Sequence, residues 1–586
     1  MPDTPQANPS QQPTDSSPTP SARRMSLLDR IEWLGNKLPE PALLFAMLAG
    51  AVILISAIGV ALGWSVQPVA PSVAMHQKLD ESGAPMLDEA GKPLMVPDVG
   101  ADGKIAVRFE PKGDPIAPRS LLTVDGVYWM LSSMVRNFTG LPALGLVFTS
   151  MLGIGVAEKF GLFSALMRFL ALATPRSLLT PVVVFVGANS SVASDAGYII
   201  LPPLAAALYA AVGRSPIAGL AAAFAGVAGG FGGGLFPTAA DGFLAGTATQ
   251  AAHIIDPSYH TVVATHNLYF KAASAVVVMV GGWFVTDRII EPRFRKATIA
   301  SAEPGSDALV ESTIASMALS PAEKRGLAIA GVVFLAVMGV FAALILMPGA
   351  PLHGTGQPAL ANGTPAPGER SGDRWSQVIV PIIFFAFVLP GAAFGRAVGL
   401  LNGQRDLIDA FYHGIRSIIP VLAISFFMGQ FVNYFQYTGL DRMLAYAGGS
   451  LLIAADLPTP LLLVLFIMLV IAGDFAISGM LSKYGILAPI FIPMFMMTGI
   501  SPELTTAAYR IGDSVVNIIT PMNSYLLIIL AVLQKYQRNA GLGSLIALMV
   551  PYSVVLGTLW TAFLLVWWLT GYPLGTGAPL EYVPSP

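Results

Sequence analysis

The sequence predicts an all-α polytopic membrane protein, with about nine transmembrane helices plus two re-entrant hairpins in an inverted repeat. The first observation is composition, since 54% of the 586 residues are hydrophobic, only 11% are charged, and the mean hydropathy is +0.67. Soluble proteins carry about 25% charged residues, so this chain belongs in a bilayer. The other two observations are a series of long apolar runs and a similarity between two segments of the chain.

Composition also narrows the partners and cofactors. A formal net charge of -2 and a pI near 6.3 leave no basic excess for nucleic acid, so no nucleic-acid partner is expected and the lipid bilayer is the expected surrounding of the chain. The absence of cysteine excludes disulfides, thiolate metal sites and a cysteine nucleophile. The six histidines are scattered and fall mostly in predicted loops, where solvated side chains are expected, so no metal site and no cofactor are predicted.

Apolar runs define the spanning helices. Residues 1–22 are rich in Pro, Ser, Thr and Gln and predict a disordered tail, which a basic, amphipathic approach follows. Crossing the roughly 30 Å hydrocarbon core takes about 20 apolar residues. Runs of that order lie at 42–64, 140–159, 216–249, 264–290, 324–347, 376–400, 413–436, 503–534 and 546–570.

The distribution of Lys and Arg predicts the orientation, because cytoplasmic loops carry an excess of these residues. A cell inner-membrane protein with a cytoplasmic N-terminus and an extracytoplasmic C-terminus satisfies this rule, apart from the long first outside loop. The inside segments are then 1–41, 160–176, 287–325, 401–416 and 535–545, and the outside segments are 65–118, 250–263, 348–375 and 437–456.

Two further apolar stretches are too short to cross. Residues 177–188 form about 18 Å of helix and then meet the polar run NSSVASD, and residues 459–472 likewise meet GDFAISGMLSK. Each polar run is followed by another short apolar helix, at 196–212 and 484–499. Because irregular backbone at membrane depth must be buried in protein, these segments predict two re-entrant hairpins with polar tips.

The two hairpin regions resemble each other at an offset of 286 residues, with about 11 identities in about 40 positions. An odd number of spanning helices separates them, so the second copy is expected upside down, although two merely similar membrane segments stay an alternative. The predicted organisation is a tail at 1–22, a lead-in with two spans at 23–159, a first repeat at 160–250, connecting helices at 251–438, a second repeat at 439–534, and a last helix and tail at 535–586.

Each repeat ends in an interrupted helix, at GGFGGGLFPT (229–238) and SVVNIITPMNS (514–524). Gly and Pro at these positions free backbone amides and carbonyls to contact ions or substrate. Inverted repeats with broken helices are typical of secondary transporters whose site lies near the membrane midplane.

The first hairpin tip offers Asn189, Ser190, Ser191 and Asp195 as substrate-binding residues, and Asp195 also as an ion-coupling residue. These side chains could equally form a satisfied polar turn that caps the next helix, since Asp and Ser favour that position. An ionisable residue at membrane depth is nevertheless a functional candidate.

The second tip adds Asp474 for ion coupling and Ser478 and Tyr484 for substrate binding. Tyr484 could stack on an aromatic substrate or serve packing alone. The neighbouring Lys483 could extend to the membrane surface or pair with Asp474.

The second broken helix carries the most informative pattern, Arg510-Ile-Gly-Asp513. Arg510 and Asp513 lie on one helical face, so they could form a structural ion pair. The functional interpretation is that Arg510 binds a substrate carboxylate and Asp513 exchanges a proton or holds a cation, together with Asn517 and Thr520. Lys271 and Asp241 are weaker candidates, because they lie near predicted helix ends where solvent exposure is expected.

Three blocks resemble the p-aminobenzoyl-glutamate transporter (AbgT) family: GANSSVASDAGYIILPPL, KYGILAPIFIPMF and YRIGDSVVNIITPMNSYLLIILAVLQKY. The resemblance implies nine spanning helices plus two hairpins, a homodimer, and ion-driven import of p-aminobenzoyl-glutamate or export of sulfonamide antimetabolites. The family's functional positions fall here on Asp195, Tyr484, Pro502, Arg510, Asp513 and Pro521.

The chain departs from the family pattern near the expected ion site. The family usually has Trp at the position of Tyr484, Asn at that of Asp474, and an Asn within the Gly-rich break where this chain has glycines at 232–234. Losing amide oxygens and gaining a carboxylate favours H⁺ over Na⁺ as the coupling ion, and both stay open.

The leading functional prediction is therefore an ion-gradient-driven transporter of aromatic or amino-acid-like anions, whose direction of transport stays open. A cation-coupled dicarboxylate symporter with similar hairpins is the alternative. An intramembrane enzyme is a remote one, because the chain lacks an HExxH motif and a Ser-His arrangement within a helix. A channel is disfavoured, since paired hairpins close around a central site.

Overall fold

The computed structural model describes residues 40–583 except 74, 78–85, 87–94, 98–106, 112, 194–195, 260–263, 295–314, 316–317, 357–371 and 478. The tail predicted at 1–22 lies outside these residues. The helices are α2 Pro41–Ala61, α3 Val124–Thr139, α4 Pro142–Lys159, α5 Leu162–Ala173, α6 Leu179–Asn189, α7 Ala196–Ala211, α8 Pro216–Phe224, α9 Ala239–Ala252, α10 Leu268–Val285, α13 Pro321–Leu346, α14 Arg374–Gln377, α15 Ile379–Ala397, α16 Gln404–Ser417, α17 Ile419–Thr438, α18 Leu440–Ala454, α19 Thr459–Asp474, α20 Met480–Met496, α21 Pro502–Val516, α22 Leu526–Tyr536 and α23 Leu542–Thr570.

Short turns and ribbons complete the described chain. The 3₁₀ turns are η1 Arg176–Leu178 and η2 Ser190–Ala193, and the π-helical turns are η3 Ala225–Gly229 and η4 Thr286–Ile290. The strands β1 Val69–Val73, β2 Met75–Gln77, β3 Met95–Pro97, β4 Val107–Pro111, β5 Thr355–Gly356 and β6 Gly372–Asp373 pair antiparallel as β1 with β4, β2 with β3, and β5 with β6. These ribbons lie in two predicted outside loops, so the membrane part is helical.

The chain is a multi-pass membrane protein. Within the described ranges, six helices are long and apolar enough to cross a bilayer, or up to eight if each of two bent helix pairs counts as one span. The predicted runs at 216–249 and 503–534 are each divided into two short helices, α8 with α9 and α21 with α22, as their central Gly and Pro residues predicted. The count of nine crossings stays a prediction.

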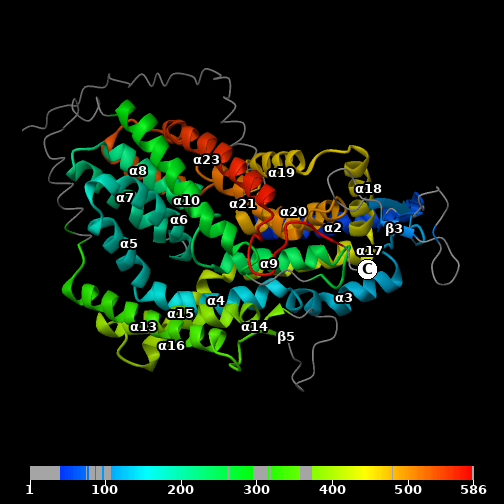
Figure 1. Cartoon of the computed structure of the whole chain (residues 1–586), viewed down its shortest axis with the longest axis horizontal. Coiled ribbons are helices and arrows are strands. Elements are labelled where there is room, and N and C mark those ends of the chain that lie inside the picture. The colour runs from blue at the N-terminus through cyan, green and yellow to red at the C-terminus, as the bar shows by residue number, and fades with distance from the viewer. Residues whose placement is uncertain are drawn as a thin grey trace, which may run out of the picture.

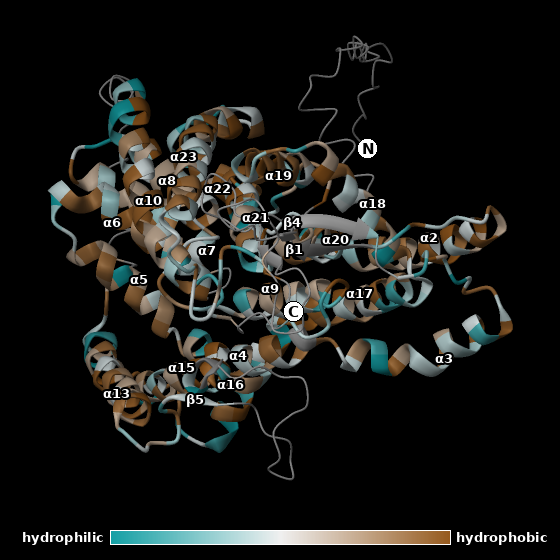
Figure 2. Cartoon of the chain, turned by 45° about the vertical axis from the view of Figure 1, so that its right-hand side comes forward, coloured by the Kyte–Doolittle hydropathy of each residue, from teal (hydrophilic) through white to brown (hydrophobic). Residues whose placement is uncertain are grey.

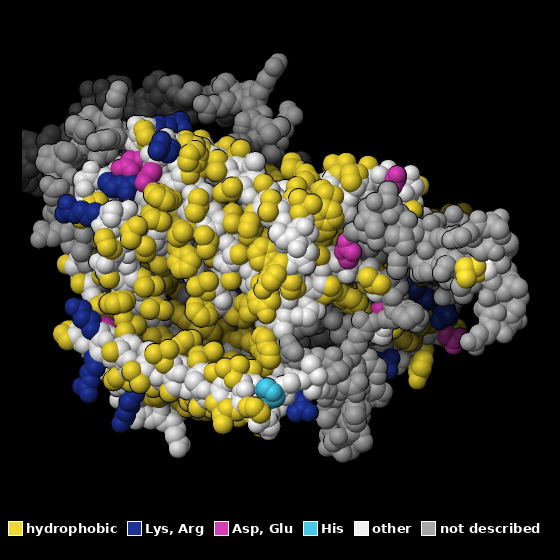
Figure 3. All heavy atoms as spheres, in the orientation of Figure 1, with side chains coloured by type: hydrophobic (Ala, Val, Ile, Leu, Met, Phe, Trp, Pro, Cys, Tyr) yellow, Lys and Arg dark blue, Asp and Glu magenta, His cyan; other side chains and the backbone are white. Residues whose placement is uncertain are grey.

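Hydrophobic residues run along most helices and hydrophilic ones gather at helix ends and loops (Figure 2). The face seen in Figure 3 is a broad hydrophobic surface, with Lys and Arg gathered mostly at its left-hand end, near the ends of α8 and α13 in Figure 1. Helix α13 has almost no buried residues, which fits contact with lipid. A row of α4, α13, α15 and α16 lies along the lower edge, and the repeats lie above it (Figure 1).

Three segments assigned to loops are helices. Segments 160–176, 401–416 and 437–456 contain α5, α16 and α18. α5 and α16 are amphipathic, with one apolar and one polar face, so they lack the continuous apolar run that marks a membrane-spanning helix. α5 meets the following helix at 116° and α16 meets α17 at 44°, so both lie beside a sharp bend in the chain.

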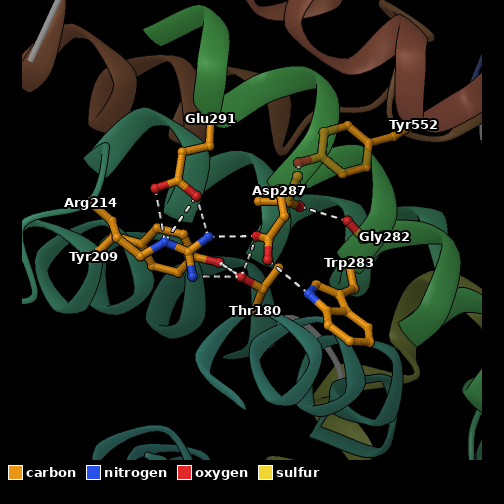
Figure 4. Close-up of polar contacts among 9 residues, drawn as sticks. Thr180, Tyr209, Arg214, Gly282, Trp283, Asp287, Glu291 and Tyr552 are labelled. Carbon is orange, nitrogen blue, oxygen red and sulfur yellow. Dashed lines mark hydrogen bonds and ion pairs between the residues drawn. The ribbon is translucent and has the colours of Figure 1, made fainter. Parts of the chain in front are cut away.

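Both predicted hairpins are present, and in each of them the two arms contact each other. In the first, Tyr209 near the end of α7 donates a 2.7 Å hydrogen bond to Thr180 at the start of α6 (Figure 4). In the second, the rings of Phe495 on α20 and Phe466 on α19 lie 5.3 Å apart. The offset of 286 residues carries Thr180 onto Phe466 and Tyr209 onto Phe495, so the two contacts between hairpin arms lie at equivalent positions of the repeats.

The same offset aligns the repeats element by element. It carries α7 onto 482–497 and α8 onto 502–510, where α20 and α21 lie, and α9 onto 525–538, where α22 lies. The contacts are reciprocal, since α20 packs on α9 while α7 packs on α22. At the second contact the rings of Tyr198 and Tyr525 stack 4.2 Å apart. Two halves related by a twofold axis pack in this way.

Candidate functional site

Helix α21 lies at the centre of the molecule, and all 15 of its residues are buried. A helix buried all round is normally hydrophobic, but α21 carries Glu503, Arg510, Asp513 and several hydroxyl groups. Buried charges must be paired, so their partners define the site.

The first group of partners is the Arg510 cluster, formed by Arg510, Asp241, Lys271 and Asn267. Arg510 Nη2 lies 2.6 Å from Asp241 Oδ1, and Arg510 Nε donates to Asn267 Oδ1 at 3.2 Å. Lys271 Nζ lies 2.6 Å from Asp241 Oδ2, with both side chains 2% exposed. One carboxylate of the first repeat is thus shared by two cations from two other helices.

Local structure explains how Asp241 reaches this position. Asp241 begins α9 after the Gly-rich break, where its Oδ2 accepts from the backbone N–H of Thr238 at 2.6 Å and from its hydroxyl at 2.8 Å. This is a capping box, which fixes the side chain over the helix start. Lys271 also donates to the Phe236 carbonyl at 2.9 Å, so α10 is tied to the break.

The second group is the Asp513 cluster, formed by Asp513, Lys483, Asp474, Asn517 and Thr520. Lys483 Nζ lies 2.9 Å from Asp513 Oδ1 and also forms an ion pair with Asp474. Asn517 donates to Asp513 Oδ2 at 3.2 Å. Thr520 donates to the Asp474 carbonyl at 3.0 Å, which ties the second break to the second hairpin tip.

The two clusters have opposite formal charges. The Arg510 cluster holds two cations and one carboxylate, a net charge of +1. The Asp513 cluster holds one cation and two carboxylates, a net charge of -1. Helix α21 therefore carries a residue of a positively charged cluster and a residue of a negatively charged cluster on neighbouring turns. The alternative of a structural ion pair between Arg510 and Asp513 is not what the structure shows, because each pairs with a residue of another element.

Two tyrosines pack beside the clusters. Tyr484 is 1% exposed and its hydroxyl shares a 2.6 Å hydrogen bond with Thr506 of α21. Its ring lies 4.7 Å from that of Tyr509, which donates to Asp513 at 3.4 Å. Tyr484 therefore packs within the protein in this conformation, and its stacking on a substrate stays a prediction.

The first hairpin tip contributes less than predicted. Ser190 and Ser191 donate to the carbonyls of Gly187 and Ala188, so they close the tip and contact neither cluster. Asn189 accepts from the Leu235 N–H at 2.8 Å and so joins the tip to the first break. Asp195 and Ser478 lie outside the described residues.

The two proline candidates lie at helix boundaries. Pro502 begins α21, where a proline needs no backbone hydrogen bond, and Pro521 follows its end within the break. Both fix backbone positions, and contacts between these rings and the clusters are not among the described interactions.

An apolar cavity of about 400 Å³ adjoins the Arg510 cluster. It is lined by Asn189, Ser190 and Phe236 together with hydrophobic residues of α5, α6, α13 and α15. Phe236 also accepts the hydrogen bond from Lys271, so a single residue separates the cavity from the cluster. Among the described residues, no three His, Asp or Glu side chains converge on one point.

Three residues near the first break were underrated from the sequence. Asp241 and Lys271 are buried and not exposed as predicted, and His266, which lies inside the predicted run 264–290 and was not singled out, is 0% exposed. Two signals were available: the Thr238–Asp241 spacing of a capping box, and the position of His266 and Lys271 inside the apolar run 264–290. The predicted pairing of Lys483 with Asp474 is confirmed.

Comparisons with known proteins agree with this architecture. Residues 26–582 match the model of the "AbgT putative transporter family". The p-aminobenzoyl-glutamate transport protein of Escherichia coli (strain K12) is 30% identical over 563 residues, covering 96% of this chain and 98% of that protein.

Two solved structures are similar over almost the whole chain. The YdaH transporter of Alcanivorax borkumensis, whose crystal structure is described as having an unusual topology, superposes with a TM-score of 0.75 at 34% identity, covering 92% of this chain and all 100% of its own. MtrF of Neisseria gonorrhoeae, described among antimetabolite efflux pumps, gives 0.78 at 36% identity, covering 96% of this chain and 100% of its own. With a match from residue 26 to 582, the chain belongs to the AbgT transporter family.

Proposed function

We propose that this protein is an ion-gradient-driven secondary transporter of aromatic, amino-acid-like anions of the p-aminobenzoyl-glutamate type, and that it also exports sulfonamide antimetabolites. The relatives named above transport p-aminobenzoyl-glutamate or pump antimetabolites. Both kinds of molecule join an aromatic ring to a polar or anionic group.

The observation that carries this proposal is the pair of oppositely charged clusters on α21. A buried group with a net charge of +1 attracts an anion, and Arg510 provides the planar donors that bind a carboxylate. A buried group with a net charge of -1 attracts a proton or a cation. Since one helix carries both, a movement of α21 alters the two sites together.

The cavity supports the aromatic part of the proposal. Ligand pockets commonly have volumes of about 300–1,000 Å³ and apolar walls. The cavity of about 400 Å³ is apolar and borders the Arg510 cluster through Phe236, an arrangement that suits a ring attached to a carboxylate. In another conformation Tyr484 would stack on that ring.

We propose the proton as the coupling ion. Asp474 gives the Asp513 cluster a second carboxylate, and a proton on either acid would neutralise the buried surplus charge. Sodium is the other candidate, with oxygen ligands from Asp513, Asn517 and Thr520. By the family resemblance and the Lys and Arg distribution, we further propose a homodimer in the inner membrane with a cytoplasmic N-terminus.

Transport by purified protein in sealed proteoliposomes tests the function. Radiolabelled p-aminobenzoyl-glutamate and a sulfonamide are followed under an imposed pH gradient and, separately, an imposed sodium gradient. We expect accumulation that depends on the pH gradient. Accumulation driven by the sodium gradient alone would make sodium, and not the proton, the coupling ion. If none of these solutes moves across the membrane under either gradient, the transport proposal is refuted.

A further inference from the structure

Two buried side chains, His266 and Arg510, have nitrogen atoms without a hydrogen-bond partner among the described residues. His266 is 0% exposed, and neither of its ring nitrogens has a partner among the described residues. Arg510 Nη2, although 2.6 Å from Asp241 Oδ1, also has no hydrogen-bond partner in this part of the chain, because its N–H groups are not directed at that oxygen. A buried donor without an acceptor costs about 1–3 kcal/mol, so two together indicate a missing ligand.

His266 is joined to the Arg510 cluster through its neighbour in the chain. It directly precedes Asn267, whose Oδ1 accepts from Arg510 Nε at 3.2 Å and whose Nδ2 donates to the His266 carbonyl at 3.2 Å. A neutral imidazole has one N–H donor and one acceptor. The shared neighbourhood of two unpartnered donors is suited to an anion that carries acceptor oxygens.

The Asp241–Lys271 pair explains how Arg510 keeps an effective charge. Asp241 Oδ2 is committed to Lys271 and to the Thr238 cap, whereas Oδ1 meets only Arg510 among the described contacts. Lys271 therefore shares the one carboxylate with Arg510, and the charge of the guanidinium is compensated only in part. Without Lys271, Asp241 would neutralise Arg510 and remove the attraction for an anion.

We propose that His266 and Arg510 together bind the carboxylate of the substrate, and that the Asp241–Lys271 ion pair is a positioning pair that leaves the Arg510 charge only partly compensated. The inference rests on the proposed function, because it takes the substrate to be an organic anion. Lys271 and Asp241 act through Arg510 and do not touch the substrate.

Binding of p-aminobenzoyl-glutamate to the purified full-length protein, measured by calorimetry, tests both parts. Lys271→Met is expected to weaken binding about tenfold or more, since an attractive charge is lost. The double variant Asp241→Asn/Lys271→Met removes both charges of the pair, keeps the net charge of +1, and is expected to bind within about threefold of the wild type. His266→Phe is expected to lose about tenfold, and His266→Gln, which keeps a donor, less.

Exposed residues supply matched controls. Lys324→Met and His353→Phe change the same residue types at exposed positions and are expected to bind as the wild type does. Size-exclusion chromatography and the melting temperature establish folding. If Lys271→Met does not fold, the double variant decides the positioning role, and His266→Gln decides the contact if His266→Phe does not fold.

The outcomes separate this inference from the proposed function. Wild-type affinity in Lys271→Met, or equal losses in the single and double variants, overturns the positioning role. If His266→Phe binds with wild-type affinity, the direct contact is overturned. It is also overturned if His266→Gln, which keeps a donor, loses as much affinity as Arg510→Ala does. A wild type that binds no aromatic anion overturns the proposed function itself.

Discussion

Asp474 is the residue that gives the Asp513 cluster its net negative charge. Its Oδ2 has no hydrogen-bond partner among the described residues, and its cation, Lys483, is shared with Asp513. A buried charge without full compensation costs several kcal/mol unless it is neutralised. Proton or cation binding at this carboxylate would remove that cost, which is why the coupling proposal depends on it.

Removal of the shared cation tests the charge balance of this cluster. Lys483→Met leaves two buried carboxylates without their shared cation, so we expect a loss of roughly 3–5 kcal/mol in the free energy of unfolding. The double variant Lys483→Met/Asp513→Asn should recover a part of it. Chemical unfolding in detergent measures both, and a single variant as stable as the wild type would contradict the ion-pair assignment.

Arg510→Ala should separate binding from stability. The variant keeps the balanced Asp241–Lys271 pair, so we expect the protein to stay folded. Loss of a charge-assisted, two-point contact should weaken binding of p-aminobenzoyl-glutamate about a hundredfold or more. Calorimetry and the melting temperature are measured side by side, and retained affinity in the folded variant would remove Arg510 from the site.

Individual residues were predictable where an ionisable group lay inside an apolar run. Arg510 and Asp513 were found in this way, and Asp474 was found in the polar run that ends an apolar stretch. Asp241 was not, because the end of a predicted helix was equated with the membrane surface. The Gly-rich break instead places the start of α9 inside the protein, so a residue at a helix end is buried at the centre.

The broken helices meet where a glycine is required. The Gly232 N–H donates to Ser514 Oγ at 2.7 Å, which joins the break of the first repeat to α21. A Cβ at Gly232 would lie 2.5 Å from Ser514 Oγ and 2.9 Å from the backbone oxygen of Arg510. The contact therefore sets how closely the two repeats approach beside the site.

Gly232→Ala should force the two broken helices apart. Because the backbone of α21 cannot yield as a flexible side chain can, we expect a loss of roughly 1–3 kcal/mol and weaker substrate binding. Gly339→Ala on α13, where no atom lies within 4 Å of the added Cβ, is the matched control and should be neutral or stabilising. Equal behaviour of the two variants in thermal unfolding would exclude a close approach at Gly232.

A polar clamp holds the base of the first hairpin (Figure 4). Arg214 lies 2.5 Å from Asp287, forms an ion pair with Glu291, and donates to Thr180 at 2.9 Å. The equivalent base of the second hairpin is closed by Phe466 and Phe495 instead. One hairpin is thus fastened to the end of α10, whose other end carries Lys271, and the other is closed by apolar packing.

Arg214→Gln tests the clamp. It leaves Asp287 and Glu291 without their shared cation, and since these side chains are 34% and 18% exposed we expect a moderate loss of roughly 1–2 kcal/mol. The exposed Arg325→Gln serves as the control. If high salt lowers the melting temperature of the wild type but not that of Arg214→Gln, the clamp is electrostatic. A variant as stable as the wild type would show that the clamp is not needed for stability.

The type of an element could be predicted where an apolar stretch was too short to cross the membrane and ended in a polar run. The hairpins followed from apolar stretches too short to cross and ending in polar runs, and the structure confirms both. α18 was missed because the charged Asp441 and Arg442 lie near the start of its 15 residues, which shortens its apolar run. α5 and α16 were missed because amphipathic helices beside a bend have no continuous apolar run. Their 3.6-residue periodicity was the signal that a search for long apolar runs passes over.

At the scale of the molecule, an apolar shell surrounds a charged centre. The offset of 286 residues found in the sequence relates the hairpins, the broken helices and their reciprocal contacts. It could not reveal which charges meet, because the Arg510 cluster joins α9, α10 and α21, and such contacts depend on the packing of the two repeats. Nor could run length fix the number of crossings, since two runs are broken at their centres.

The central claim is that α21 separates substrate binding from ion coupling, and Asp474→Asn in proteoliposomes tests it most directly. Exchange of labelled for unlabelled p-aminobenzoyl-glutamate at equal pH is compared with accumulation under an imposed pH gradient. We predict that the variant exchanges substrate like the wild type and no longer accumulates it. Accumulation at the wild-type level, or loss of exchange in a folded variant, would contradict the separation.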